Sequence, residues 1–475
     1  MEIEKTIYAN ILLYEIYNQN KKTHINTNSN SLILSSYEKT TIFSNPNILK
    51  EGLEELILKG KYDIEICTNM PSTLKYINMG NLYNKMIPIN LFPLNLIKLS
   101  FGKCFNQEFD ILPPKLQILE LGHSYNKKFK HNVLPQTLTH LSFSKNSLYN
   151  QPFEENVLPK SLQYLSFNGH FFDTDFEYEL CYQDLCILQD DSTNDFNQII
   201  NENVLPQSLI YLKFSNRFNH KIDKNVLPKR LKYLIFGTLY NTEIDIDVLP
   251  NSIEFLKFDT QFNKKINTLP LSLKTLIFGK MFNQPINIGL LPNGLETLSF
   301  NTFFNQDLEA GTLPKSVKYL YFGLKFNKSL KKDVLPSNLL HLQICNIPYN
   351  DINFILPQKL ISVTISITIS KHNDIFNLVP NLLYLKVYTT FDRFQCTYYI
   401  NFPNNSLPME IYGKKVSILE SKKLNNCAKE LINNISNNLK GNVILEELVK
   451  HTMHPSKIIK ILSEKRDACN IENYI

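Results

Sequence analysis

The sequence "LPLSLKTLIFGKMFNQPI" at residues 269–286 is one copy of a phrase that the chain repeats along most of its length. Close variants are "LPKRLKYLIFGTLYNTEI" at residues 227–244 and "LPKSVKYLYFGLKFNKSL" at residues 313–330. Apolar residues alternate across the L-x-F segment of each copy, which is typical of a short β-strand with one buried face. The repetition therefore decides the fold class, and the residues that differ between copies are the place to look for function.

The copies recur with a period of about 22 residues. In the most regular stretch the leading prolines are Pro206 and Pro228 (228 − 206 = 22) and then Pro250 (250 − 228 = 22). This period lies within the range of about 20–29 residues of leucine-rich repeats and below the roughly 33–47 of helical repeats. A single copy cannot bury its apolar face alone, so the copies must stack. The sequence predicts a solenoid with one long parallel sheet of about fifteen short strands.

Three regions follow from the extent of the repeats. Residues 50–402 hold the repeats, beginning with a copy that has Lys50 in place of the proline. Residues 1–49 are expected to form an N-terminal cap with a flexible stretch, and residues 403–475 a helical C-terminal cap or tail. The helical expectation rests on apolar residues at helical spacing, closed by a glycine: Leu424, Cys427, Leu431, Ile435, Leu439 and Gly441.

The repeated phrase, written LPxSLxxLxFGxxFNQPI, resembles the FNIP repeat, a leucine-rich-repeat-like module of social amoebae and of giant viruses of amoebae. The similarity extends over residues 50 to about 400, and implies a leucine-rich-repeat-like solenoid. Several members of that family carry an F-box before the repeats, which implies a substrate receptor of a ubiquitin ligase. Residues 1–49 show no recognisable F-box pattern, so the resemblance implies a ubiquitin link without supplying the adaptor-binding module.

The composition indicates the compartment of the protein but does not indicate a reaction or a ligand. The chain has 475 residues, a net charge of +6 and eight scattered cysteines, which suits a reducing compartment. Its N-terminal residues make a poor signal peptide and no apolar run approaches roughly 18 residues, so we expect an intracellular protein of the cytoplasm, or of the host cytoplasm if it is viral. Because no phosphate loop, zinc helix or nucleophile elbow occurs, the sequence predicts no enzyme, catalytic residue, cofactor or metal.

Two positions of the repeat have predicted structural roles. An asparagine recurs thirteen residues after the proline, and it reads either as a row of ligand-binding amides or as a buried ladder that pairs backbone groups between coils; we favour the ladder. A glycine recurs nine residues after the proline, where it is expected to let the chain turn sharply after the strand. The asparagines include Asn84, Asn106, Asn126, Asn219, Asn241, Asn263, Asn283, Asn305 and Asn327, and the glycines Gly80, Gly102, Gly122, Gly237, Gly279 and Gly323.

The positions five and seven residues after the proline flank a buried leucine and are expected to face outward. They carry many aromatic and basic side chains, which neighbouring parallel strands about 4.8 Å apart should bring into a stripe. Two interpretations remain open: a cross-strand ladder that stabilises the sheet, or a binding surface with aromatic anchors. The candidate binding residues are Tyr211, Lys213, Tyr233, Phe255, Lys257, Tyr319 and Tyr321.

One repeat contains an insertion. The prolines Pro159 and Pro206 are 47 residues apart (206 − 159 = 47), and the excess falls at residues 168–195. This segment has eight acidic residues and no Lys or Arg. Its fragments of calcium-loop and zinc-ligand patterns are incomplete, so we interpret it as a solvated acidic loop that could dock onto a basic partner or onto lysine-rich faces of the same chain.

The sequence thus predicts a non-enzymatic scaffold for protein–protein interaction. Its partner is a protein of unknown identity, and the family resemblance extends the prediction to a substrate-recognition or host-factor-binding role in a ubiquitin pathway. One alternative is single-stranded nucleic-acid binding by the Tyr/Lys strand face, which the acidic insertion and the modest net charge disfavour. A second alternative is an enzyme. No membrane association is expected, and the oligomeric state is left open.

Overall fold

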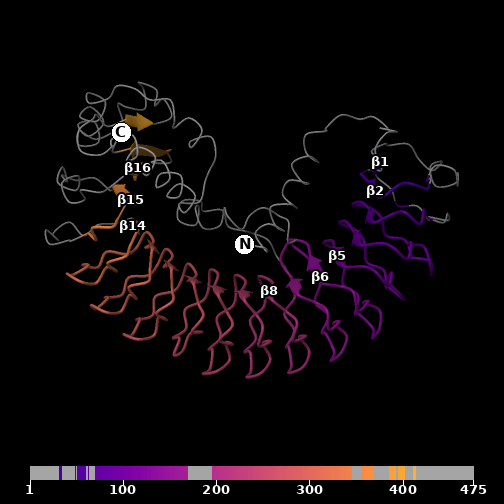
Figure 1. The fold of residues 1–475 in the computed structure, drawn as a ribbon, viewed down its shortest axis with the longest axis horizontal. Coiled ribbons are helices and arrows are strands. Elements are labelled where there is room, and N and C mark those ends of the chain that lie inside the picture. Colours follow the sequence, from indigo (N-terminus) through magenta and orange to yellow (C-terminus); the bar gives the residue numbers. More distant parts are fainter. Residues whose placement is uncertain are drawn as a thin grey trace, which may run out of the picture. The chain divides into compact units, whose positions relative to one another are not determined.

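The computed structural model of the chain consists of stacked coils, each with one short strand (Figure 1). It describes residues 49, 51–59, 63, 70–169, 195–344 and 356–360, and the backbone of the strands at 31–34, 362–367, 384–391, 394–401 and 410–412. The chain divides into unit 1 (residues 1–174 and 190–253) and unit 2 (residues 175–189 and 254–475). Each unit is described by itself.

Unit 1 is a parallel sheet in which each strand pairs with the next one along the chain. The apolar residue six positions after the proline aligns from strand to strand, as Leu212 does with Leu234. The predicted strands around Leu212 and Leu234 are confirmed to within one residue. The strands are β1 (Ser31–Leu34), β2 (Glu55–Leu58), β3 (Tyr76–Asn78), β4 (Lys98–Ser100), β5 (Ile118–Leu121), β6 (His140–Phe143), β7 (Tyr164–Ser166), β8 (Tyr211–Lys213) and β9 (Tyr233–Ile235).

Unit 2 continues the same pattern and ends differently. Strands β10 to β16 are parallel, whereas β17 and β18 add antiparallel pairs at the end of the sheet. The predicted helices from Leu424 onward lie outside the described residues, as does most of residues 1–49. The strands are β10 (Phe255–Lys257), β11 (Thr275–Ile277), β12 (Thr297–Ser299), β13 (Tyr319–Tyr321), β14 (His341–Ile344), β15 (Ser362–Ile367), β16 (Tyr384–Phe391), β17 (Phe394–Asn401) and β18 (Glu410–Tyr412).

The core is a column of leucines and aromatic rings between the strands and the loops. In the coil of β9, Leu231 and Leu234 are fully buried, and Phe236 stacks on Tyr240 at 3.9 Å between ring centroids. The stack passes from coil to coil, since Phe214 lies 5.4 Å from Phe236 with the rings nearly parallel. Each coil thus buries its apolar side chains against the next coil, which is why the units are stable only as arrays.

A left-handed residue precedes most of the prolines by three positions. Asn225 and Asp247 have φ of 67°, and Gly289 has φ of 84°. Asn, Asp and Gly adopt this conformation at the lowest cost, so the residue type follows from the backbone. The two coils of 20 residues (113 − 93 and 270 − 250) have no positive φ at this place, because they lack the two residues that make the turn.

Except at Gly80, which has φ of 73°, the recurring glycine after the strand has a different role from the predicted one. Gly237 and Gly279 do not have positive φ, so a sharp turn is not what requires them. Instead, a Cβ on Gly279 would lie 1.7 Å from the carbonyl oxygen of Asp259, and one on Gly237 would lie 1.8 Å from that of Ser215. The physical reason for the glycine is therefore the close approach of the preceding coil.

The asparagine ladder is confirmed. The Oδ1 atom of Asn126 accepts a hydrogen bond from the backbone N–H of Asn150 at 2.9 Å and another from Nε2 of Gln151 at 3.1 Å. In unit 2, Asn283 accepts in the same way from Asn305. One part of the prediction is wrong: the ladder is half-buried or exposed, because it runs along the outside of the turn that follows each strand.

Candidate functional site

The strand face opposite the core is the candidate site that the sequence predicted. On β8 the side chains of Tyr211 and Lys213 are half-buried while Leu212 between them is fully buried, as alternation along a strand requires. Because neighbouring strands are in register, equivalent residues of successive coils lie side by side on this face. We use the name strand face for the residues five and seven positions after each proline.

An aromatic row crosses the strand face of unit 1. The centroids of Tyr164 and Tyr211 are 6.2 Å apart and those of Tyr211 and Tyr233 are 6.3 Å apart, with tilted rings. The row begins with His140, which stacks on Tyr164 at 4.3 Å and an angle of 8°. The predicted stripe is thus present from His140 to Tyr233. His140 was not among the predicted candidates, although it lies five residues after Pro135, the same repeat position as the tyrosines. We call these four residues the aromatic row.

His140 contributes a neutral ring to the aromatic row. Burial lowers the pKa of its imidazole to about 4; the nearby Glu120 carboxylate opposes this shift and Lys98 adds to it. The Oγ1 atom of Thr139 lies 2.8 Å from Nδ1 of His140. At neutral pH the residue is therefore a flat, uncharged stacking surface, and not a cation.

A buried ion pair lies beside the aromatic row. Glu120 is only 7% exposed, and its carboxylate accepts a hydrogen bond from Ser100 Oγ at 2.6 Å and pairs with Lys98 Nζ at 2.9 Å. All three residues project from β4 and β5 in register. Since the carboxylate is held on two sides, this part of the strand face is a fixed polar element.

The remaining candidate residues are in unit 2, and several are more buried than predicted. Phe255 is 9% exposed, Lys257 6% and Tyr321 4%, so these three side chains offer little accessible surface. Tyr319 stays half-buried, and burial together with the nearby Glu296 raises the pKa of its phenol.

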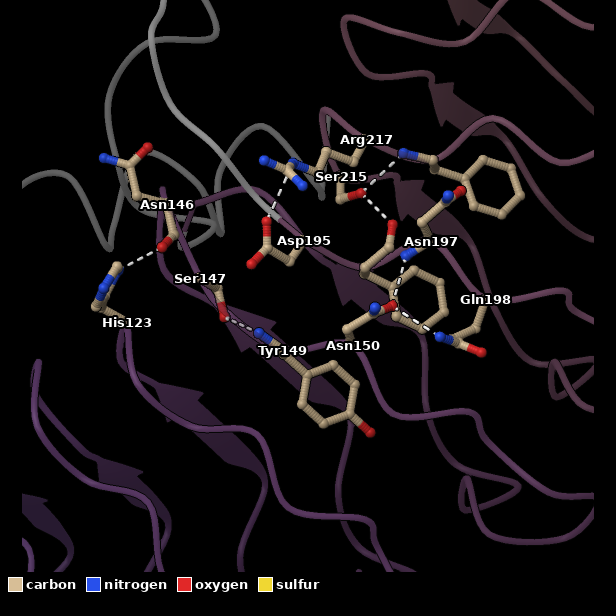
Figure 2. A network of polar contacts seen from close by, with 12 residues as sticks. His123, Asn146, Ser147, Tyr149, Asn150, Asp195, Asn197, Gln198, Ser215 and Arg217 are labelled. Atoms are coloured by element: carbon tan, nitrogen blue, oxygen red, sulfur yellow. Dashed lines mark hydrogen bonds and ion pairs between the residues drawn. The ribbon is translucent and has the colours of Figure 1, made fainter.

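The ends of the acidic insertion are fixed to neighbouring coils of unit 1, and Figure 2 shows the contact of Asp195 with Arg217 at one of them. At one end the N–H of Gly169 donates to the carbonyl oxygen of Phe143 at 2.9 Å. At the other end Asp195 pairs with Arg217 at 3.1 Å, and its N–H donates to the carbonyl oxygen of Ser147 at 2.9 Å. The acidic residues between these ends, at 170–194, lie outside the described residues, so the predicted role of the insertion stays a prediction.

Two further findings concern possible ligands. Within the described ranges no group of three His, Cys, Asp or Glu side chains is placed to hold a metal ion. In the same part of the chain there is no apolar helix of membrane-spanning length.

Short parallel strands, a 20- to 24-residue coil and an asparagine ladder together define a leucine-rich-repeat-like solenoid. Comparison with protein families finds the FNIP repeat seven times in the chain, and the protein is accordingly a FNIP-repeat protein. The matched segments are residues 105–146, 147–174, 196–239, 218–261, 240–280, 262–303 and 304–346.

A solved structure supports the same class. The chain is similar to CroV588, a protein whose crystal structure is described as a novel circular LRR protein structure, with 35% sequence identity and a TM-score of 0.60. The similarity covers 71% of this chain and 48% of CroV588, so the chain spans about half the length of that protein. A comparison with curated proteins finds no match.

Proposed function

We propose that the chain is a non-enzymatic scaffold that binds a protein partner through the strand face of unit 1. The observation that carries this proposal is the aromatic row, in which four rings project from four adjacent strands in register. Half-buried tyrosines on a rigid support lose little conformational freedom when they bind, and truncation of such anchors typically costs about 2 kcal/mol or more.

Repeat solenoids of this class are typically interaction scaffolds, and no motif of an enzyme accompanies the repeats. Within the described residues, the polar groups of the strand face are engaged in structural contacts such as the Lys98–Glu120 pair. A role as a substrate-recognition or host-factor-binding protein of a ubiquitin pathway, inside the cell, is a narrower form of the proposal that rests on the family resemblance. Recovery of a cullin-adaptor protein with the tagged chain would support it, and its absence would remove it.

The experiment replaces Tyr211 and Tyr233 together by Ala in the tagged full chain and compares the proteins that co-purify. A matched control replaces Thr275 and Thr297 by Ala, since these residues occupy the same repeat position on β11 and β12 without an aromatic ring. We expect the tyrosine variant to lose partners that the control retains, with both variants folded by circular dichroism. Full retention of every partner by the tyrosine variant would show that the aromatic row only stabilises the sheet.

A further inference from the structure

Along six consecutive coils of unit 1 the border of the strand face carries cations and no acids, whereas the first coil has Glu51 and Glu54 at these positions. After each proline the chain makes a turn, as where Leu231 N–H donates to the carbonyl oxygen of Pro228 at 3.0 Å, and then enters the strand. The residues one, two and four positions after the proline therefore line the N-terminal ends of the strands. In the coils that begin at Pro93, Pro113, Pro135, Pro159, Pro206 and Pro228, these positions include no Asp or Glu. Their cations, here called the basic edge, are Lys115, Lys160, Lys229, Arg230 and Lys232.

Four of the five cations of the basic edge have no ion-pair partner within the part of the chain that the structure describes. Lys115, Lys160, Lys229 and Arg230 are exposed, and none of these four forms an ion pair with a described residue. The lysines in the loops that follow the strands of the same coils are in a different situation, because they form ion pairs with acidic residues of adjacent coils. The pairs are Lys130–Glu108 at 2.7 Å, Lys221–Asp245 at 2.7 Å and Lys224–Asp247 at 3.3 Å.

The basic edge runs beside the aromatic row. Lys232 directly precedes Tyr233; the cations of the basic edge belong to the coils of β5, β7 and β9, and the aromatic row spans β6 to β9. From the coil of Lys115 to that of Lys229 there are four coil spacings of about 4.8 Å, or roughly 19 Å. An extended polypeptide covers this length with about six residues. A segment lying along the sheet would therefore meet rings on one side and cations on the other.

We propose, resting on the proposed function, that the aromatic row and the basic edge together bind an extended acidic segment of a protein partner. The segment presents carboxylates to the basic edge and aromatic or apolar side chains to the row. Positive potential along the edge attracts such a segment and sets its direction, while the rings supply most of the binding energy. A nucleic acid fits less well, because its continuous phosphates would find basic-edge cations only in the coils of β5, β7 and β9 and would meet the uncharged His140 on β6.

The test measures binding of fluorescent probes to the full chain by anisotropy. The probes are a peptide of about ten residues with alternating Glu and Tyr, the same peptide with Lys in place of Glu, and an oligothymidylate of similar length. We expect the acidic peptide to bind, with an affinity that falls as salt is raised, and the basic peptide not to bind. Tighter binding of the oligothymidylate at the same residues would overturn the proposal in favour of a nucleic acid.

Charge reversal locates the interaction. Lys229→Glu with Arg230→Glu should weaken acidic-peptide binding at least tenfold. The matched control, Lys103→Glu with Lys127→Glu, changes net charge equally at positions after the strands and should change the affinity less than twofold. Equal effects of the two variants would show that only net charge matters, and would overturn the proposal. Unchanged urea midpoints confirm that each variant is folded.

The same probe separates this proposal from the proposed function. If Tyr211→Ala with Tyr233→Ala abolishes peptide binding while reversal of Lys229 and Arg230 does not, the aromatic surface stands and the acidic partner is wrong. If charge reversal abolishes binding while the tyrosine variant binds normally, the basic edge stands and the aromatic surface is wrong.

Discussion

The contribution of a single acceptor atom of the asparagine ladder to stability can be tested by substitution. Oδ1 of Asn283 accepts hydrogen bonds from the N–H of Asn305 at 2.8 Å and from Nε2 of Gln306 at 3.1 Å, and Nε2 of Gln306 also donates to the carbonyl oxygen of Asn283 at 3.0 Å. The substitution Asn283→Ala removes Oδ1 and leaves the Asn305 amide without its acceptor. The substitution Asn283→Asp keeps an oxygen at the same place. The chain already uses an Asp in this way, because Oδ1 of Asp63 accepts from the N–H of Asn84 at 3.0 Å.

The magnitude follows from the two bonds that Oδ1 accepts. Each intramolecular hydrogen bond contributes about 0.5–1.5 kcal/mol, so the loss of two should lower the free energy of unfolding by about 1–3 kcal/mol. Asn283 is half-buried and water can reach one of the freed groups, so we expect a value near 2 kcal/mol. Asn283→Asp should cost less than about 0.5 kcal/mol, because a carboxylate accepts both bonds and accepts them more strongly.

Urea denaturation of the wild type and both variants gives the free energies of unfolding, and hydrogen exchange of a peptide containing Asn305 gives the local effect. Exchange at Asn305 should quicken in Asn283→Ala and not in Asn283→Asp. Wild-type stability and exchange in Asn283→Ala would refute the reasoning, as would an equal loss of stability in both variants. The second result would mean that the amide nitrogen, and not Oδ1, holds the coils together.

Three other predictions test the core, the glycine and the histidine. Phe236→Ala should lower the free energy of unfolding by about 3–5 kcal/mol, measured by urea denaturation, because it empties the stacked column. Gly279→Ala should destabilise by more than about 1 kcal/mol, measured by the urea midpoint, because the new Cβ meets the Asp259 carbonyl at 1.7 Å. The folded-state pKa of His140, about 4, is below its unfolded value near 6.5, so the neutral form is favoured by folding. This contribution to the free energy of unfolding is complete above pH 6.5 and should be lost as the pH falls to 4. Urea denaturation at a series of pH values should show a loss of about 3 kcal/mol.

Each of these predictions has a control. Phe236→Leu should recover part of the stability that Phe236→Ala loses. Gly294→Ala is the matched control for Gly279, since a Cβ there has only one neighbour, at 3.9 Å; equal losses at both sites would contradict the close-approach argument. His140→Phe should flatten the pH dependence between pH 6.5 and 4 while keeping a ring beside Tyr164, and an unchanged slope would assign the dependence to other groups.

What repeats in the sequence was predictable. The strand positions, the register of Leu212 with Leu234, the buried Phe236 and the Asn283–Asn305 bond all follow from a pattern that recurs along the repeats. A residue that recurs at one offset must do the same work in each coil, and alternation along a strand then divides buried from outward positions. The sequence by itself therefore determined the solenoid, its leucine-rich-repeat-like class and most of its core.

Only the tertiary structure decided what depends on the neighbouring coil. The clash that requires Gly279 is set by a backbone carbonyl of the preceding coil, and the stacking of His140 on Tyr164 is set by a side chain 24 residues away (164 − 140 = 24). The 6% exposure of Lys257 is likewise not visible in the repeat pattern. The same holds for the half-burial of the aromatic row and, among the described residues, for the absence of an ion pair at Lys115, Lys160, Lys229 and Arg230. The repeat period determines the direction in which each side chain points. Its burial and its charged neighbours depend on the adjacent coil, and they are set only when the coils stack.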